Sequence, residues 1–254
     1  MKTKISVVSY KRPDNNTCNL LLEAGIEDWQ VYAYSFDPYI DEYINNYGKH
    51  VRVITEFDKA SLPKKRQLVL DEAIKLGYDY CIMMDDDIYQ MKDLQLDKDL
   101  TITDFIDILQ TFGYNNKEYV ALSACYNRGD DVVINDYKNI CNNSIFNLSL
   151  LKSSDVTYND KSKCEDMEFA IDLMLKGYKT GRLEVLLGKN QLQGGTTGDG
   201  LSYRFKNTNR FIEEGTYMQN RYPELKDVFE FDENHFKMNT KKLKNCLQYK
   251  ITSI

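Results

Sequence analysis

The chain has 254 residues, 42% hydrophobic and 28% charged, so it is long and apolar enough to fold as a globular protein. The net charge of −6 excludes a uniformly basic nucleic-acid binder, and no apolar run approaches the roughly 18 residues of a membrane span. With only two histidines a multi-histidine metal site is excluded, so a metal would rest on carboxylates, which favours Mn²⁺ or Mg²⁺ over Zn²⁺.

The six cysteines are scattered and form no CxxC pair, which indicates free thiols in a reducing compartment. Met1–Lys4 leads directly into a strand-like segment and lacks the pattern of a signal peptide. We therefore expect a cytoplasmic protein without a membrane span.

The first half of the chain alternates between strand and helix periodicities. Apolar, β-branched runs predict four strands, at Lys4–Tyr10, Gln30–Phe36, Val51–Phe57 and Tyr78–Met84. Between them we expect a helix capped by Asp14 and ended by Gly25, a helix opened by Asp37-Pro38 and ended by Gly48, and a helix over Leu62–Leu76 ended by Gly77. This alternation predicts an α/β fold with a parallel sheet, whose ligands bind beyond the carboxyl ends of the strands.

The second half mixes its elements. We expect helices at Thr103–Phe112, ended by Gly113, and at Ser162–Lys176, ended by Gly177. Strands are predicted at Tyr119–Tyr126, Ile140–Leu151 and Leu183–Leu187, and polar or glycine-rich loops at Asn127–Asp136 and Gln193–Gly200. From Tyr203 the chain is aromatic and basic and should be helical in parts.

The fourth predicted strand runs into three consecutive carboxylates, Asp85, Asp86 and Asp87. Their mutual repulsion predicts a bound cation, the alternative being a solvated turn. Residues i and i+2 of an extended chain point the same way, so Asp85 and Asp87 should face the metal. Asp86 should point toward a ribose hydroxyl or into the fold and tolerate substitution best. Because Mg²⁺-type ions share phosphate oxygens with their substrates, a nucleotide diphosphate is the expected ligand.

Basic and polar residues are predicted at the same edge of the sheet. Ser9, Lys11 and Arg12 follow the first strand, and Lys65 and Arg66 open the third helix. Cations at a helix start oppose the helix dipole unless an anion lies nearby. Helix-start amides with an arginine fork therefore predict a diphosphate site, and an exposed basic turn is the alternative.

Three further features are candidates for the site. Ser162 and Glu165 have the spacing of a capping box, which would explain Glu165 structurally, whereas Asp166 in the first turn would stay ionised and suits a base for an acceptor hydroxyl. The Gln193–Gly200 loop could close over a sugar-phosphate or serve as a linker. His235 is a candidate metal ligand or a surface histidine.

Together these motifs resemble the GT-A glycosyltransferases of the family-two-like type. The resemblance covers residues from about 4 to 187 and rests on Ser9–Pro13, Lys65–Gln67, Ile82–Asp87 and Glu165-Asp166 before the helix that Gly177 ends. It implies one GT-A domain over 1–254, with a nucleotide-sugar half (4–100), an acceptor and catalytic half (101–202) and a basic tail (203–254). The enzyme would be a metal-dependent hexosyl- or pentosyltransferase, with a UDP-sugar favoured as donor.

Carried over by position, Asp87 looks like the metal-binding aspartate and Asp85 like the one near the ribose or metal. Lys65 and Arg66 fall where the family contacts the nucleotide or diphosphate, and Asp166 looks like the base of an inverting transfer, although a retaining enzyme could use it for positioning. The Gln-x-x-Arg-Trp motif of processive members is missing, which argues against a processive membrane polymerase. Gln67 stands where the family often has asparagine.

The Ser9–Pro13 start, the Lys65–Gln67 helix, the three aspartates and the Gly194–Gly198 loop look most like the TET-associated glycosyltransferases of phage. That likeness implies a hydroxymethyl-pyrimidine in double-stranded DNA as acceptor, flipped out of the duplex, and a location in the host cytoplasm if the chain is phage-encoded. Between Lys237 and Ile254 there are five lysines and no acid, which gives a separate reason to consider a phosphate-backbone partner, with a solvated tail as the alternative.

Other functions stay open at this point. The acceptor could instead be a surface glycan or a lipid-linked sugar. A nucleotidyltransferase would want a glycine-rich loop after the first strand, where this chain has Lys11–Asp14. A non-catalytic nucleotide-sugar-binding module is the third class.

Overall fold

The computed structural model describes residues 1–125, 132–138, 140, 143–190, 210–233 and 235–251. The first half supplies four parallel strands, β1 (Thr3–Val8), β2 (Trp29–Tyr34), β3 (Val51–Ile54) and β4 (Tyr80–Asp85). The second half adds β5 (Ile88–Asp93), β6 (Lys98–Asp99), β7 (Tyr119–Cys125), β8 (Ile134–Asp136), β9 (Asn143–Asn147) and β10 (Lys179–Asn190).

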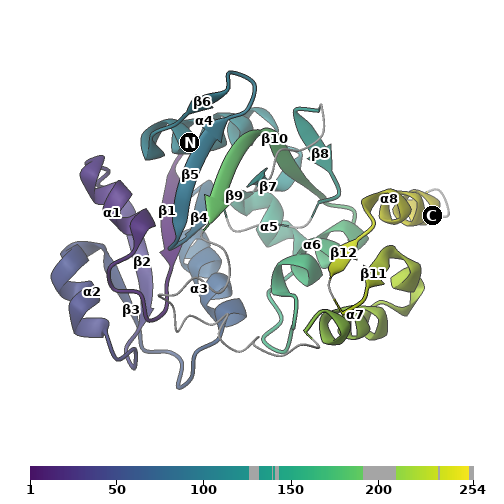
Figure 1. Ribbon diagram of the computed structural model, residues 1–254, viewed down its shortest axis with the longest axis horizontal. Helices are drawn as coiled ribbons and strands as arrows, with labels where there is room; N and C mark the ends of the chain where they lie inside the picture. Colours follow the sequence, from purple (N-terminus) through teal and green to yellow (C-terminus); the bar gives the residue numbers. More distant parts are fainter. Residues whose placement is uncertain (126–131, 139, 141–142, 191–209, 234, 252–254) are drawn as a thin grey trace.

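These strands form one sheet in the order β3-β2-β1-β4-β9-β7-β10-β5-β6, with β8 beside β10 (Figure 1). Strand β9 runs antiparallel to β4 and β7, while β10 runs parallel to β7 and antiparallel to β5. The prediction of a mainly parallel sheet with a mixed second half is confirmed.

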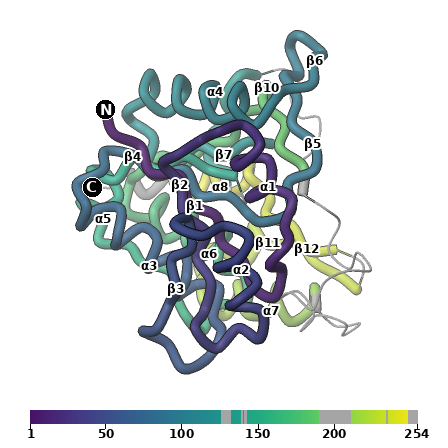
Figure 2. The backbone as a smooth tube through the Cα atoms, turned by 90° about the vertical axis from the view of Figure 1, so that its left-hand side faces the viewer, coloured from purple at the N-terminus to yellow at the C-terminus, as the bar shows by residue number. Residues whose placement is uncertain are grey.

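Helices cover both faces of the sheet and make two cores. On one face lie α1 (Asn16–Glu23), α2 (Ile40–Tyr47) and α4 (Ile102–Asn115). On the other face lie α3 (Leu62–Lys75), α5 (Leu148–Ser154) and α6 (Glu165–Leu175). Figure 2 shows α4 above the strands and α3 below them. A 3-10 turn, η1 (Gly48–His50), leads into β3. Side chains alternate along β4, so Ile82 and Met84 enter the α4-side core and Cys81 and Met83 the α3-side core.

The starts of α1 and α2 differ from the prediction. The side chain of Asn15, one residue after the predicted cap, accepts the backbone N–H of Cys18, and Asp14 instead accepts from the side chain of Asn19. Helix α2 begins two residues beyond Asp37-Pro38. One oxygen of the Asp37 carboxylate accepts the backbone N–H of Tyr39, just before the helix, and the other accepts the backbone N–H of Lys11 and so holds the segment after β1.

Two strand predictions in the second half are wrong in extent. The segment predicted as one strand over Ile140–Leu151 turns into α5 at Leu148, because the side chain of Asn147 accepts the N–H of Leu150 and caps a helix there. The strand predicted at Leu183–Leu187 is only the middle of β10, and the β5–β6 hairpin was not predicted.

The C-terminal segment is folded onto the α3-side core and is not a solvated tail. It comprises α7 (Arg210–Arg221), the 3-10 segment η3 (Pro223–Val228), the hairpin β11 (Phe229–Phe231) and β12 (Phe236–Met238), and α8 (Thr240–Ile251). Its buried side chains Met218, Tyr222, Leu225, Val228, Phe229, Leu243 and Leu247 all belong to that core. Lys237 and Lys242 both pair with Glu230, so this one carboxylate offsets part of the positive charge of the segment.

Within the described ranges no helix is both long and apolar enough to cross a membrane. The cysteines that can be described, Cys18, Cys81, Cys125, Cys164 and Cys246, are all free, as expected. The cytoplasmic location and the three-part division of the chain stay predictions.

The prediction that Gly113 ends the helix before it is wrong. Helix α4 continues to Asn115, and Gly113 lies buried where the helix approaches β9. A Cβ atom at this position would lie 2.6 Å from Cδ1 of Ile145. The glycine is therefore required by the close approach of the helix to the sheet.

We predict that Gly113→Ala lowers the free energy of unfolding by about 1–3 kcal/mol, since the added methyl group overpacks this contact. In an exposed helix the same change would stabilise by about 1 kcal/mol. Chemical denaturation measures the difference. Ile145→Val removes Cδ1, so Gly113→Ala should lower the free energy of unfolding by less in that background. An equal loss in both backgrounds, or a gain in stability in both, would contradict the packing argument.

Candidate active site

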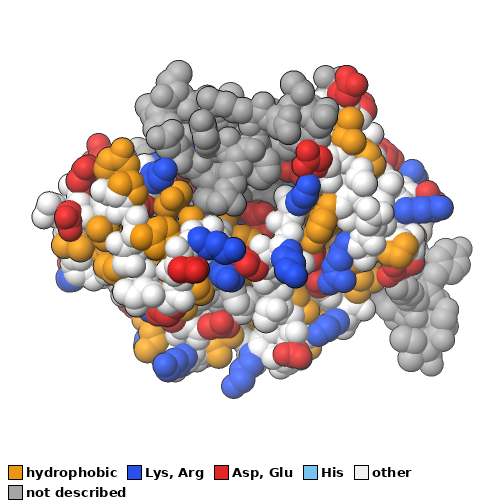
Figure 3. Space-filling view, turned by 90° about the horizontal axis from the view of Figure 1, so that it is seen from below, with side chains coloured by type: hydrophobic (Ala, Val, Ile, Leu, Met, Phe, Trp, Pro, Cys, Tyr) orange, Lys and Arg blue, Asp and Glu red, His pale blue; other side chains and the backbone are white. Residues whose placement is uncertain are grey.

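The turn after β4 carries the three aspartates to the carboxyl edge of the sheet. Because Cys81 and Met83 face α3, continued alternation places Asp85 on the same side, toward the starts of α3 and α6. Asp86 and Asp87 then follow in a turn before β5. Figure 3, which shows the molecule of Figure 1 from below, has acidic and basic side chains intermixed near the middle of this face.

Arg66 joins Asp85 to the acidic start of α6. Its guanidinium lies 3.4 Å from Asp85 and 3.6 Å from Glu165, and it donates to Asp166. The side chain is only 4% exposed, since Arg66 shares the stripe of α3 that buries Leu70 and Ala73. Burial lowers the pKa of Arg66, but Asp85 and Glu165 raise it by more, so the guanidinium stays charged. Residues 100 apart in sequence thus meet at one buried cation.

A second ion-pair cluster holds the other two aspartates. Arg12 Nη1 lies 2.8 Å from Asp86 and 3.1 Å from Asp87. Asp86 is buried and also accepts the hydroxyl of Ser9, at 2.6 Å. Since Ser9 and Asp86 are buried and bonded to each other, they support the turn and do not line an open ligand site. We withdraw the expectation that Asp86 tolerates substitution best.

Two residues that fix this turn were not predicted from the sequence. Thr17 in α1 donates its hydroxyl to the carbonyl of Asp85 and accepts the N–H of Ile88, at 2.7 and 3.1 Å. The Tyr43 hydroxyl lies 2.6 Å from that of Ser9 and accepts the backbone N–H of Arg12. Both contacts are long-range, so no local motif could have revealed them.

Lys65 occupies a different environment from the diphosphate contact predicted for it. Its amine is buried and donates to the carbonyls of Ser9 and Tyr32, and it lies 4.1 Å from the ring centre of Tyr34. Burial lowers the pKa of Lys65 to about 7, although Asp86 and Asp37 act in the opposite direction. We therefore assign Lys65 to the support of strands β1 and β2 and correct its predicted role.

The charge balance suits a divalent cation. Carboxylates at Asp85, Asp86, Asp87, Glu165 and Asp166 face the guanidinium groups of Arg12 and Arg66. Burial raises the pKa of Asp85 to about 7; Arg66 opposes this rise, and Asp87 and Asp86 add to it. Such crowding favours an added cation bound by hard oxygen ligands.

Asp85 and Asp87 are the residues that would hold such a cation. Their side chains are 21% and 19% exposed, against 9% for Asp86. In the described part of the chain no three His, Cys, Asp or Glu side chains form a ready-made cage. A Mg²⁺ or Mn²⁺ ion that shares phosphate oxygens with its substrate needs only one or two protein carboxylates.

The start of α6 lacks the capping box that was predicted. The helix cap is Cys164, without a side-chain capping bond, and Ser162 Oγ accepts the N–H of Cys164. Glu165 therefore loses its structural explanation and faces Arg66 beside Asp166. The structure thus places both acidic residues at Arg66, together with Asp85.

Other predicted site residues lie elsewhere. His235 follows β11, half-exposed and 2.8 Å from Asp232, on the hairpin that Figure 1 places on the opposite side of the molecule from β1 and β2. Its role as a metal ligand stays a prediction. The Gln193–Gly200 loop lies outside the described residues, but β10 leads toward it with Asn190 paired to Ile88, next to Asp87. Lys11 adopts a left-handed backbone (φ 57°) beside Arg12.

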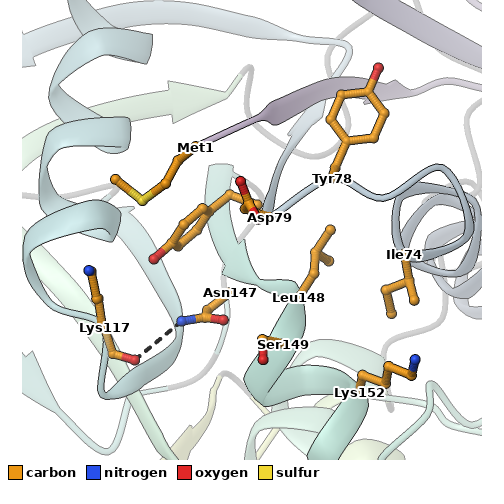
Figure 4. A pocket seen from close by; sticks show the side chains of 10 residues that line it. Met1, Ile74, Tyr78, Asp79, Lys117, Asn147, Leu148, Ser149 and Lys152 are labelled. Carbon is orange, nitrogen blue, oxygen red and sulfur yellow. Dashed lines mark hydrogen bonds between the residues drawn. The ribbon is translucent and has the colours of Figure 1, made fainter.

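A separate cavity of about 430 Å³ lies at the other end of β4 (Figure 4). It is lined by Met1, Ile74, Tyr78, Asp79, Tyr80, Lys117, Asn147, Leu148, Ser149 and Lys152. None of the carboxylates around Arg66 contributes to it, and it opens where β4 begins. The cavity is therefore distinct from the acidic site.

Comparison with known proteins identifies the fold. No protein-family model matches the sequence, and no curated protein matches it. Among solved structures, the mannosyltransferase PcManGT from Pyrobaculum calidifontis, in complex with GDP-Man and Mn²⁺, is similar with a TM-score of 0.57 and 9% identity, over 98% of this chain and 68% of that one. Residues 1–349 of S. aureus TarS, in complex with UDP, align with a TM-score of 0.48 and 18% identity.

This chain has the GT-A type of fold. It shares this fold with PcManGT over 98% of its own length, and its sheet order is the one described above. The TarS alignment covers 74% of this chain, which spans 59% of the TarS chain. At these identities the likeness concerns the fold, so activity has to be argued from the residues around Arg66.

Proposed function

We propose that this protein is a metal-dependent glycosyltransferase that moves a sugar from a nucleotide-sugar to an acceptor hydroxyl. The observation that carries the proposal is that Arg66 contacts both Asp85, in the turn suited to a metal ion, and Asp166, at the start of α6. The fold it shares with PcManGT, which was solved with GDP-Man and Mn²⁺, supports the same reading. Sugar transfer needs carboxylates that bind the metal for the donor and a base for the acceptor hydroxyl within one site.

The roles follow from the chemistry of transfer. A divalent cation on Asp85 and Asp87 would neutralise the diphosphate that leaves the donor. Asp166 accepts the proton of the acceptor hydroxyl as its oxygen bonds to the sugar carbon, while the bond from that carbon to the diphosphate breaks. Arg66 keeps Asp166 oriented, and Glu165 lies beside the same guanidinium as a second carboxylate.

Donor binding and turnover can be separated by two variants. We predict that the Tm of the wild type rises when Mn²⁺ is added together with a ligand that it binds, from a panel of UDP, GDP, UDP-glucose, UDP-N-acetylglucosamine, UDP-galactose and GDP-mannose. Asp87→Ala should abolish this metal-dependent rise in Tm. Asp166→Asn should keep this rise yet lower turnover by about 10²-fold or more, because it removes the base. Asp107→Ala, an exposed aspartate on α4, is the matched control and should behave as wild type.

Each alternative has its own signature in this experiment. A non-catalytic binding module would show the metal-dependent rise in Tm without turnover of any donor. Full turnover in Asp166→Asn would refute the assignment of the base. No ligand-induced rise with any donor, with or without Mn²⁺, would refute the proposal as a whole.

For the acceptor we propose a hydroxymethyl-pyrimidine in DNA, with a UDP-sugar as donor. The support is the likeness of the motifs to the TET-associated enzymes. The basic C-terminal segment supports it less than the sequence suggested, since Lys237 and Lys242 pair with Glu230. A surface glycan or a lipid-linked sugar is the alternative acceptor.

Mass spectrometry tests the acceptor directly. We predict that DNA containing 5-hydroxymethylcytosine or 5-hydroxymethyluracil gains the mass of a hexose or pentose when incubated with the protein, Mn²⁺ and the donor panel. DNA with unmodified pyrimidines is the control and should gain none. Donor turnover without added mass on any base would reject the DNA acceptor while leaving the glycosyltransferase proposal intact.

A further inference from the structure

We propose that Glu168 is a positioning residue for the base Asp166, acting by fixing the first turn of α6 against α7; this inference rests on the proposed function. Nothing in the sequence pattern singled out Glu168. It lies two residues after Asp166 and does not contact Arg66 in the described structure.

Glu168 is a buried carboxylate that gathers donors from two other segments. Its side chain is 1% exposed. It accepts hydrogen bonds from Asn159 Nδ2 at 2.7 Å and the Tyr217 hydroxyl at 2.6 Å, and Arg221 Nε lies 3.3 Å away. Asn159 belongs to the loop before α6, and Tyr217 and Arg221 to α7. One carboxylate thus connects α6 to both neighbours.

The geometry of a helix makes Glu168 complementary to Arg66. Residues i and i+2 are separated by about 200° around a helix, so Asp166 and Glu168 project to nearly opposite sides. Arg66 holds Asp166 from the side of α3, and Tyr217 and Arg221 hold Glu168 from the side of α7. The first turn is held between these two contacts, in a helix whose N-cap residue Cys164 makes no side-chain capping bond.

The ionisation of Glu168 is consistent with this role. Burial raises the pKa of Glu168, but hydrogen bonds from Asn159, Ser162, Tyr217 and Arg221 together lower it by more, so the pKa lies below the ordinary value for glutamate. The charged form is therefore the one that the surrounding donors stabilise.

The same helix provides a matched control. Asp172 lies four residues further along α6, accepts the Tyr222 hydroxyl at 2.8 Å and lies 3.7 Å from Arg221. It ties α6 to α7 as Glu168 does, but it lies about one helical turn further from Asp166 than Glu168 does. A purely structural role predicts similar effects for both carboxylates, whereas positioning predicts an effect on catalysis for Glu168 alone.

The test compares Glu168→Gln with Asp172→Asn. Hydrogen exchange should be faster in Glu168→Gln for peptides that cover 165–171, and unchanged there in Asp172→Asn. With the donor of the panel that the wild type turns over, Glu168→Gln should lower kcat by about tenfold or more with KM for the donor and the Mn²⁺ dependence unchanged, because a misplaced base costs rate and not binding. Asp172→Asn should retain kcat within about twofold.

The outcomes separate this inference from the proposed function. Unchanged exchange in Glu168→Gln would overturn the tether, whatever the activity. Faster exchange with an unchanged kcat, or equal losses of kcat in both variants, would overturn the positioning role. If the wild type turned over no donor, the proposed function would fail first, and the exchange result would still report on the tether.

Discussion

A buried guanidinium surrounded by carboxylates is the interaction on which the rest of the site depends. Arg66 contacts Asp85, Glu165 and Asp166 with almost no exposure to solvent. Removing one partner from a buried ion pair is costly, because the remaining charge is left without compensation. The three acidic residues and Arg66 must therefore be kept together, and they in turn hold the end of β4 close to the start of α6.

The topology of the sheet makes that meeting possible. Parallel strands β1 and β4 end at the same edge, and the alternation of β4 turns Asp85 toward the face that α3 and α6 cover. On the other side of the turn, Thr17 and Tyr43 reach in from α1 and α2. The acidic turn is thus held from both faces of the sheet, as a site on rigid elements requires.

Local signals predicted the four parallel strands of the first half, the three helices between them and the acidic turn, because apolar periodicity and glycine stops act within a few residues. They failed where a distant contact decides. Gly113 was predicted to end a helix, but it lies within α4 where the helix comes close to Ile145. Lys65 reads as a ligand contact, yet the stripe that buries Val69 also buries its amine. Glu168 carries no motif, because its partners on α7 are about fifty residues away.

The central claim is that Arg66 couples the two acidic segments, and a double-mutant cycle tests it most directly. The free energy of unfolding would be measured for Arg66→Met, Asp166→Asn and the double variant by chemical denaturation. The account predicts a coupling energy of about 0.5–3 kcal/mol, since the two side chains form one buried pair. Additive effects of the two substitutions would contradict it.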